Sequence, residues 1–88
     1  MITVDDVVYL LPVDITHRSK TELRYRMSRG GSMTLLFGKK PGLTEFTLMA
    51  LIVRDQHGKK QLGVKFEPEH TPADLGRYVA NNLCKKEG

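Results

Sequence analysis

The segment at residues 20–32, K-T-E-L-R-Y-R-M-S-R-G-G-S, alternates between polar and apolar side chains before it reaches a pair of glycines. Successive side chains of a strand point to opposite faces, so Leu23, Tyr25 and Met27 share one face. The opposite face is charged and carries Lys20, Glu22, Arg24 and Arg26. The segment therefore predicts a strand with one cationic face that ends in a tight turn.

Four other segments have the composition of strands, and turn residues separate them. Residues 7–15 are rich in β-branched side chains, and Pro12 has no N–H to donate, which places this strand at an edge or at a bulge. The glycines at residues 30–31 can supply the positive φ angles of a tight reversal, and the Pro-Gly pair at residues 41–42 fits a type II turn. We expect strands over residues 7–15, 21–27, 32–37, 44–55 and 62–66.

The C-terminal segment carries the signals of a helix. Thr71 is a good N-cap, Pro72 suits the first helical position, and Asp74 stands where a capping box has its acid. One apolar stripe at helical spacing can pack on a sheet and comprises Leu75, Tyr78, Val79 and Leu83. We expect a helix over about residues 71–86. The predicted fold class is mainly β (α+β): a five-stranded curved antiparallel sheet or small barrel with one C-terminal helix, in a single domain over residues 1–88.

The composition is that of a folded cytoplasmic domain. Apolar residues make up 40% and charged residues 27%, which are ordinary values for globular proteins. The longest apolar run, at residues 48–53, is far shorter than the ~20 residues of a spanning helix, and Asp5 and Asp6 stand where a signal peptide carries Lys or Arg. The single cysteine, Cys84, agrees with a reducing compartment and leaves a homo-oligomer through intermolecular pairing open. We therefore expect a cytoplasmic location and no membrane association.

Positive charge is concentrated in the middle of the chain. Seven of the 14 Lys and Arg lie within residues 18–40 against one acid, Glu22, although the net charge of the whole chain is only +4. This cluster favours an anionic partner, while an exposed strand face is polar in most proteins without any ligand. The glycine pair likewise fits either a plain hairpin turn or a nest of N–H groups around an anion. The candidate anion-binding residues are Lys20, Arg24, Arg26, Ser28, Arg29, Gly30, Gly31, Lys39 and Lys40.

The chain carries no catalytic signature, since the G-x-S-x-G, HExxH, CxxC and Walker patterns are all missing. His17, His57 and His70 share no metal-ligand spacing. We therefore expect no enzymatic activity, no metal and no cofactor. The leading hypothesis is a non-enzymatic domain whose basic strand and loops contact the phosphates of a nucleic acid or nucleotide. The alternative is a protein-interaction or regulatory adaptor that docks on an acidic protein through an edge strand or an outer helix face.

The C-terminal half resembles the PilZ family, whose members are small β-barrels that bind cyclic di-GMP. The sequence G-V-K-F at residues 63–66, followed by the capped helix, is similar to that family's closing strand and helix. Ser28 and Gly31 stand as the Ser and Gly of its (D/N)-x-S-x-x-G motif. The acidic or amide position is Arg26 here, and the upstream R-x-x-x-R motif is absent. The resemblance thus implies a degenerate relative that acts through protein contacts and does not bind cyclic di-GMP.

Overall fold

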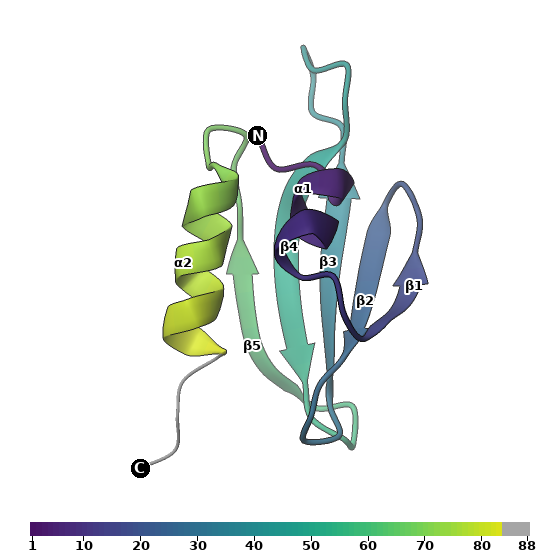
Figure 1. Ribbon diagram of the computed structural model, residues 1–88. Coiled ribbons are helices and arrows are strands. Elements are labelled where there is room, and N and C mark those ends of the chain that lie inside the picture. Colours follow the sequence, from purple (N-terminus) through teal and green to yellow (C-terminus); the bar gives the residue numbers. More distant parts are fainter. Residues whose placement is uncertain (84–88) are drawn as a thin grey trace.

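The computed structural model describes residues 1–83, which form five strands and two helices. The strands make one antiparallel sheet in the order β1-β2-β3-β4-β5, and both helices lie on the same face of it (Figure 1). The mainly β fold is confirmed, and the sheet is open rather than closed into a barrel. The elements are α1 (Val4–Leu10), β1 (Ile15–Arg18), β2 (Glu22–Arg26), β3 (Ser32–Gly38), β4 (Thr47–Arg54), β5 (Lys60–Lys65) and α2 (Pro72–Asn82). Four of the five expected strands are therefore confirmed as β2 to β5, with shifted ends.

The first element is a helix, so the expected strand over residues 7–15 is wrong. The Thr3 hydroxyl accepts a hydrogen bond from the Asp6 N–H (3.2 Å), and the Asp6 carboxylate accepts one from the Thr3 N–H (3.0 Å). This capping box satisfies two N–H groups at the helix start. The apolar residues of the segment recur at helical spacing and pack into the core: Val4, Val7, Val8 and Leu11. Pro12 follows the helix, which it cannot continue, and is not part of an edge strand.

One edge of the sheet is β1, a four-residue strand that the sequence pattern did not predict. Its residues after Ile15 are exposed, so the strand lacks the apolar alternation that reveals a half-buried strand. Asp14 leads into it with a φ of 66°, a left-handed conformation that Asp adopts more readily than most residues. The Asp14 carbonyl accepts a hydrogen bond from the Arg26 N–H (2.8 Å), which joins this edge to β2.

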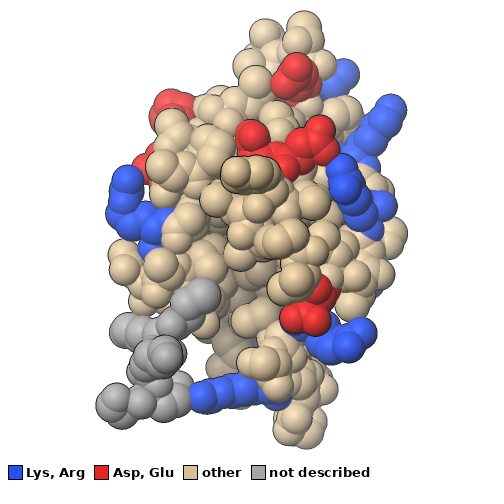
Figure 2. All heavy atoms as spheres, viewed as in Figure 1, with Lys and Arg blue, Asp and Glu red and all other residues tan. Residues whose placement is uncertain are grey.

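The core lies between the sheet and the two helices. Leu23 pairs with Leu35, which in turn pairs with Leu51, so that one apolar row crosses β2, β3 and β4. All three side chains are 0% exposed. On the helix-covered face, Lys and Arg lie near the edges, acidic side chains lie above and below the middle, and the centre is uncharged (Figure 2). The helices therefore cover the apolar face of the sheet, and the opposite face, here called the outer face, is covered by no helix or strand of residues 1–83.

Two turns of the same form close the lower end of the sheet as seen in Figure 1. In each, a glycine with positive φ donates its N–H to the carbonyl three residues earlier: Gly30 (φ 92°) to Met27 at 3.1 Å and Gly58 (φ 83°) to Asp55 at 2.9 Å. Glycine adopts this conformation without steric cost. At the upper end, Gly42 (φ 88°) completes the expected Pro-Gly turn.

The C-terminal helix α2 begins at the expected capping box. The Thr71 hydroxyl accepts a hydrogen bond from the Asp74 N–H, and the Asp74 carboxylate accepts one from the Thr71 N–H. Leu75 and Val79 are buried against the sheet, while Tyr78 and Leu83 pack at the edge of the core. The expected helix end near residue 86, and Cys84, lie outside the described residues. No helix in residues 1–83 is long and apolar enough to cross a membrane.

Candidate binding surfaces

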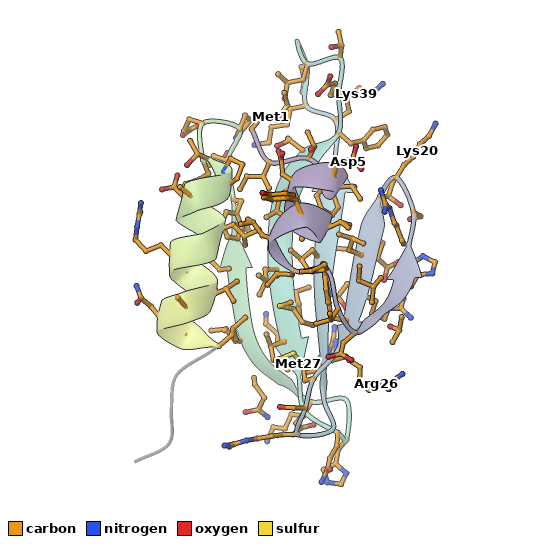
Figure 3. The ribbon with its side chains drawn as sticks, in the orientation of Figure 1. Met1, Asp5, Lys20, Arg26, Met27 and Lys39 are labelled. Carbon is orange, nitrogen blue, oxygen red and sulfur yellow. The ribbon has the colours of Figure 1, made fainter. Side chains whose placement is uncertain are left out.

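The nine candidate anion-binding residues fall into three separate places. Lys20, Lys39 and Lys40 lie at the upper end of the sheet, whereas residues 28–31 form the turn at the lower end (Figure 3). Arg24 and Arg26 lie between them on β2, and both are exposed. The fold therefore does not gather the nine residues into one site.

The outer face of the sheet collects cations from several strands in register. The row nearest the lower end runs from Arg26 through Ser32 and Arg54 to Lys60, across four strands. The middle row contains Arg24, Thr34, Ile52 and Gly63, and the upper row contains Glu22, Leu36, Ala50 and Lys65. Five of these side chains are basic and one is acidic, which gives the outer face a net charge of +4.

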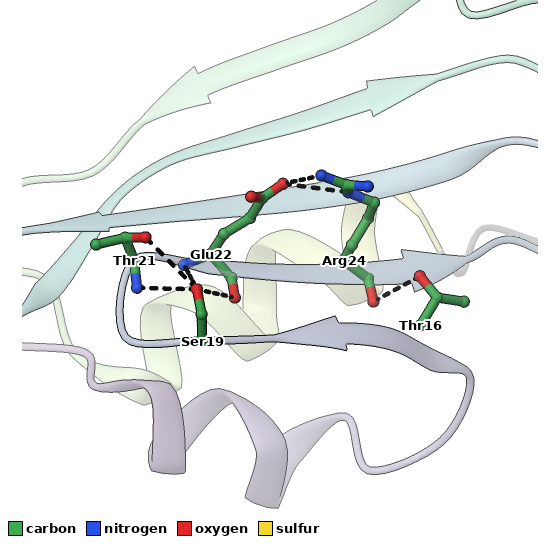
Figure 4. A network of polar contacts seen from close by, with 5 residues as sticks. All are labelled: Thr16, Ser19, Thr21, Glu22 and Arg24. Carbon is green, nitrogen blue, oxygen red and sulfur yellow. Dashed lines mark hydrogen bonds and ion pairs between the residues drawn. The ribbon is translucent and has the colours of Figure 1, made fainter.

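Arg24 is the one outer-face cation that forms an ion pair with a described residue. Its Nη2 atom lies 2.5 Å from Oε2 of Glu22, and its Nε donates to the same oxygen at 3.1 Å (Figure 4). The backbone carbonyl of Arg24 also accepts a hydrogen bond from the Thr16 hydroxyl at 3.2 Å. Glu22 therefore orients one arginine and neutralises it locally, which leaves the other four cations to set the charge of this face.

The lower row holds the least neutralised cations. Arg26 and Lys60 make no ion pair or hydrogen bond through their side chains with any residue in the described range. Arg54 reaches only the Gly58 carbonyl, at 3.4 Å. The Lys60 side chain lies across Gly63, whose missing side chain leaves room for it, because a Cβ there would come 2.8 Å from Lys60 Cε. The row therefore presents charge to solvent over the width of β2 to β5.

The outer face is slightly hollow and includes two apolar side chains, Leu36 and Ile52. A depression of about 410 Å³ is lined by charged and uncharged residues: Glu22, Arg24, Ser32, Thr34, Leu36, Ile52 and Arg54. Leu36 is 38% exposed in it, whereas its neighbour Leu35 is fully buried on the other face. This surface can contact an apolar group as well as an anion.

The turn at residues 27–31 serves the hairpin. The Gly30 N–H donates to Met27, as described above, so in this conformation it is not available to an anion. Gly31 has ordinary φ but lies against the backbone of β4, because a Cβ at Gly31 would overlap the Arg54 carbonyl oxygen. The glycine pair thus combines a positive φ at Gly30 with a close approach at Gly31, and this close approach lets the two lower turns lie side by side. A role for Ser28 and Arg29 in anion binding stays a prediction.

At the upper end, Lys40 is paired and Lys20 is not. Lys40 Nζ lies 2.8 Å from the Glu67 carboxylate, and this hydrogen bond holds the pKa of Glu67 below its ordinary value. Lys20 makes no ion pair with a described residue. Lys39 lies over the ring of Phe46, with 5.2 Å between Nζ and the ring centroid.

Sequence reasoning missed three cations of the outer face: Arg54, Lys60 and Lys65. They stand on β4 and β5, outside the basic segment at residues 18–40, and only strand register brings them beside Arg24 and Arg26. The available signal was the alternation of β5, which already places Lys65 on the outside. The same alternation would place Gln61 rather than Lys60 on the outside, because an irregularity in register between Val53 and Arg54 brings Lys60 opposite Arg54.

No Phe, Tyr or Trp side chain of the described residues lies on the outer face, although His17 of β1 pairs with Arg24 there. Tyr25 points the other way, as predicted: it is buried, and its hydroxyl donates to the Leu11 carbonyl at 2.7 Å. Burial raises the pKa of Tyr25 and the nearby Arg18 partly offsets this rise. Within residues 1–83, no three His, Cys, Asp or Glu side chains gather in a way that could hold a metal ion.

Comparison with family models, with curated proteins and with solved structures found no match to this chain. The resemblance to the PilZ family stays a prediction that rests on residues 26–31, on residues 63–66 and on the capped helix that follows them.

Proposed function

We propose that this chain is a non-enzymatic cytoplasmic binding domain whose outer sheet face binds the phosphate backbone of a nucleic acid. The observation that carries the proposal is the row of Arg26, Arg54 and Lys60, supplemented by Arg24 and Lys65 above it. Basic side chains that neutralise phosphates release condensed counterions, and this release supplies most of the affinity of sequence-independent binding.

The spread of the cations favours a polymer over a single nucleotide. Neighbouring strands are ~4.8 Å apart, so the row from β2 to β5 spans about 14 Å, which exceeds what one phosphate group can contact. The row does not converge on a point, as it would around a single anion. An extended backbone with regularly spaced phosphates can meet all of the cations together.

The uncharged part of the outer face argues against base recognition. Single-stranded nucleic acids are commonly held by aromatic side chains that stack on the bases, and no Phe, Tyr or Trp is present on this face among the described residues. The face is also a sheet surface without a protruding helix that could enter a groove. We therefore expect binding that depends on backbone charge and little on base sequence.

A salt titration tests this proposal. With four or five phosphate contacts, the affinity for a labelled DNA or RNA oligonucleotide should fall roughly 10²- to 10³-fold between 50 and 200 mM salt. Fluorescence anisotropy measures this dependence, and oligonucleotides of unrelated sequence should give similar values. Absence of any complex with DNA and with RNA at 50 mM salt would contradict the proposal.

The second candidate is an adaptor for an acidic protein, and Leu36 is the observation that favours it. A phosphate backbone gains nothing from an exposed leucine on a cationic face, whereas an acidic segment with apolar side chains could cover both the leucine and the cations. The edge strands β1 and β5 offer a further means of attachment, by addition of a partner strand.

Substitution of Leu36 separates the two candidates. Leu36→Ser should leave oligonucleotide affinity unchanged if the outer face binds phosphates alone, and should weaken a complex that buries the leucine. Co-purification gives the second readout, because nuclease treatment should release a partner that is held through nucleic acid and should not release an acidic protein bound directly.

A further inference from the structure

A second hollow lies away from the outer face, at the upper end of the molecule. It is a shallow cleft of about 840 Å³ between the start of α1, the β1–β2 turn and the β3–β4 loop. Its lining joins residues far apart in the chain: Thr3, Val4, Asp5, Arg18, Ser19, Lys20, Lys39, Thr44, Glu45 and Phe46. The volume is within the range of small-molecule sites, roughly 300–1,000 Å³.

Two lysines define the charge of this cleft. Lys20 and Lys39 extend from different loops, and Asp5 at the start of α1 belongs to the same lining (Figure 3). Asp5 is engaged by Arg18, whose Nη2 lies 2.7 Å from its carboxylate, so these two charges offset each other. Lys20 and Lys39 then oppose only the exposed carboxylate of Glu45. The cleft is left with a small excess of positive charge at its mouth.

The apolar part of the cleft is formed by Val4 and Phe46, both of which are only half-buried. Lys39 lies over the face of the Phe46 ring, so cation and ring are held next to each other. A ligand with an anionic group could reach the lysine while a flat apolar body packed along Val4 and the exposed part of Phe46. An anion without such a body would leave this apolar surface in water, and a neutral ring would leave the lysines without a partner.

We propose that this cleft binds a small aromatic anion, an aryl phosphate or aryl carboxylate, with its charged group between Lys20 and Lys39 and its ring against Phe46. The site shares no residue with the outer face. The proposal for this cleft is therefore independent of the proposal that the outer face binds nucleic acid, and the oligonucleotide titration does not test it.

Titration with phenyl phosphate, followed by NMR shifts of the backbone amides, tests the proposal. Saturable shifts should appear at residues 3–5, 18–20 and 39–46, and inorganic phosphate and phenol should each bind more weakly than phenyl phosphate. Benzoate in place of phenyl phosphate tests whether a carboxylate serves as the anion. Shifts confined to residues of the outer face, or shifts that inorganic phosphate reproduces with equal affinity, would overturn the proposal.

The affinity of charge variants for phenyl phosphate tests whether the charges of the cleft contact the anion. Lys20→Gln should weaken phenyl phosphate binding by about two- to fivefold, and Glu45→Gln should strengthen it by a similar factor, because exposed charge pairs contribute up to about 1 kcal/mol. Arg77→Gln on α2 removes the same charge far from the cleft and should leave the affinity unchanged. Equal effects of Lys20→Gln and Arg77→Gln would mean that net charge alone attracts the anion, and the site would be rejected.

Discussion

The two faces of the sheet use the same strands for opposite purposes. Leu35 and Leu36 are neighbours on β3, yet the first is 0% exposed beneath the helices and the second is 38% exposed on the outer face. Tyr25 and Arg26 on β2 divide in the same way. Because side chains alternate along a strand, a single run of sequence supplies both the core that stabilises the fold and the cations that we assign to binding. We therefore expect that substitutions on one face leave the role of the other face intact.

The largest expected effect lies on the helix-covered face. Leu35→Ala should reduce the free energy of unfolding by about 2–5 kcal/mol, because it removes a fully buried side chain and leaves a cavity. The matched change Leu36→Ala should cost less than about 1 kcal/mol, since the leucine is partly solvated already. Urea denaturation of both variants measures the difference. An equal loss of unfolding free energy in the two variants would mean that the outer face is also covered, which would contradict the difference between the two faces.

A second prediction concerns the turn that aligns the lower cation row. Gly31→Ala should destabilise the fold by about 1–3 kcal/mol, because the new Cβ would overlap the Arg54 carbonyl and force the two turns apart. Gly76→Ala is the control, since a Cβ there meets no atom within 4 Å and alanine favours a helix. Thermal unfolding should show a lower Tm for the first variant and an unchanged or higher Tm for the second. An unchanged Tm for Gly31→Ala would show that the turn accommodates the added Cβ, and it would contradict the predicted overlap with the Arg54 carbonyl.

The smallest expected effect on stability lies at Tyr25. Tyr25→Phe removes the hydrogen bond to the Leu11 carbonyl and should cost about 0.5–1.5 kcal/mol near neutral pH. Burial raises the pKa of Tyr25 in the folded state above 10.0, its ordinary value, so the unfolded chain releases this proton first as pH rises. The Tyr25 contribution is therefore present below pH 10 and is lost above it.

The corresponding measurement is the free energy of unfolding of both forms from pH 8 to 11. The advantage of the unmodified protein over Tyr25→Phe should shrink as pH passes 10. A difference that stays constant over this range would mean that Tyr25 titrates alike in the folded and unfolded states.

Most of the fold could be predicted because each of its signals is local. Alternation placed β2, β4 and β5, the turns on either side placed β3, the Thr71 and Asp74 pair placed α2, and glycines marked the turns. The strand predicted over residues 7–15 was wrong because their β-branched side chains are typical of strands. The signal that indicates a helix is the capping box of Thr3 and Asp6, which lies just before them. Residues of β1 gave no signal at all, since an exposed edge strand has no apolar face.

The candidate surface could be predicted only in part, because it depends on register between strands. Arg24 and Arg26 share a face by alternation alone, and that much the sequence pattern indicates. Arg54 and Lys60 join them through pairing across β3 to β5, which no local pattern specifies. Lys39 and Lys40 were grouped with them by sequence distance, but the hairpin carries them to the far end of the sheet.

The most direct test of the outer face compares two double variants with the same net charge. Arg26→Gln with Arg54→Gln removes two cations of the lower row, whereas Lys40→Gln with Arg77→Gln removes two cations that lie elsewhere. In anisotropy titrations at 50 mM salt, the first should weaken oligonucleotide binding by about 10-fold or more and reduce the salt slope by roughly two, while the second should change both only slightly. Equal losses in the two variants would contradict the account, since binding would then follow the net charge of the protein rather than the face on which the charge lies.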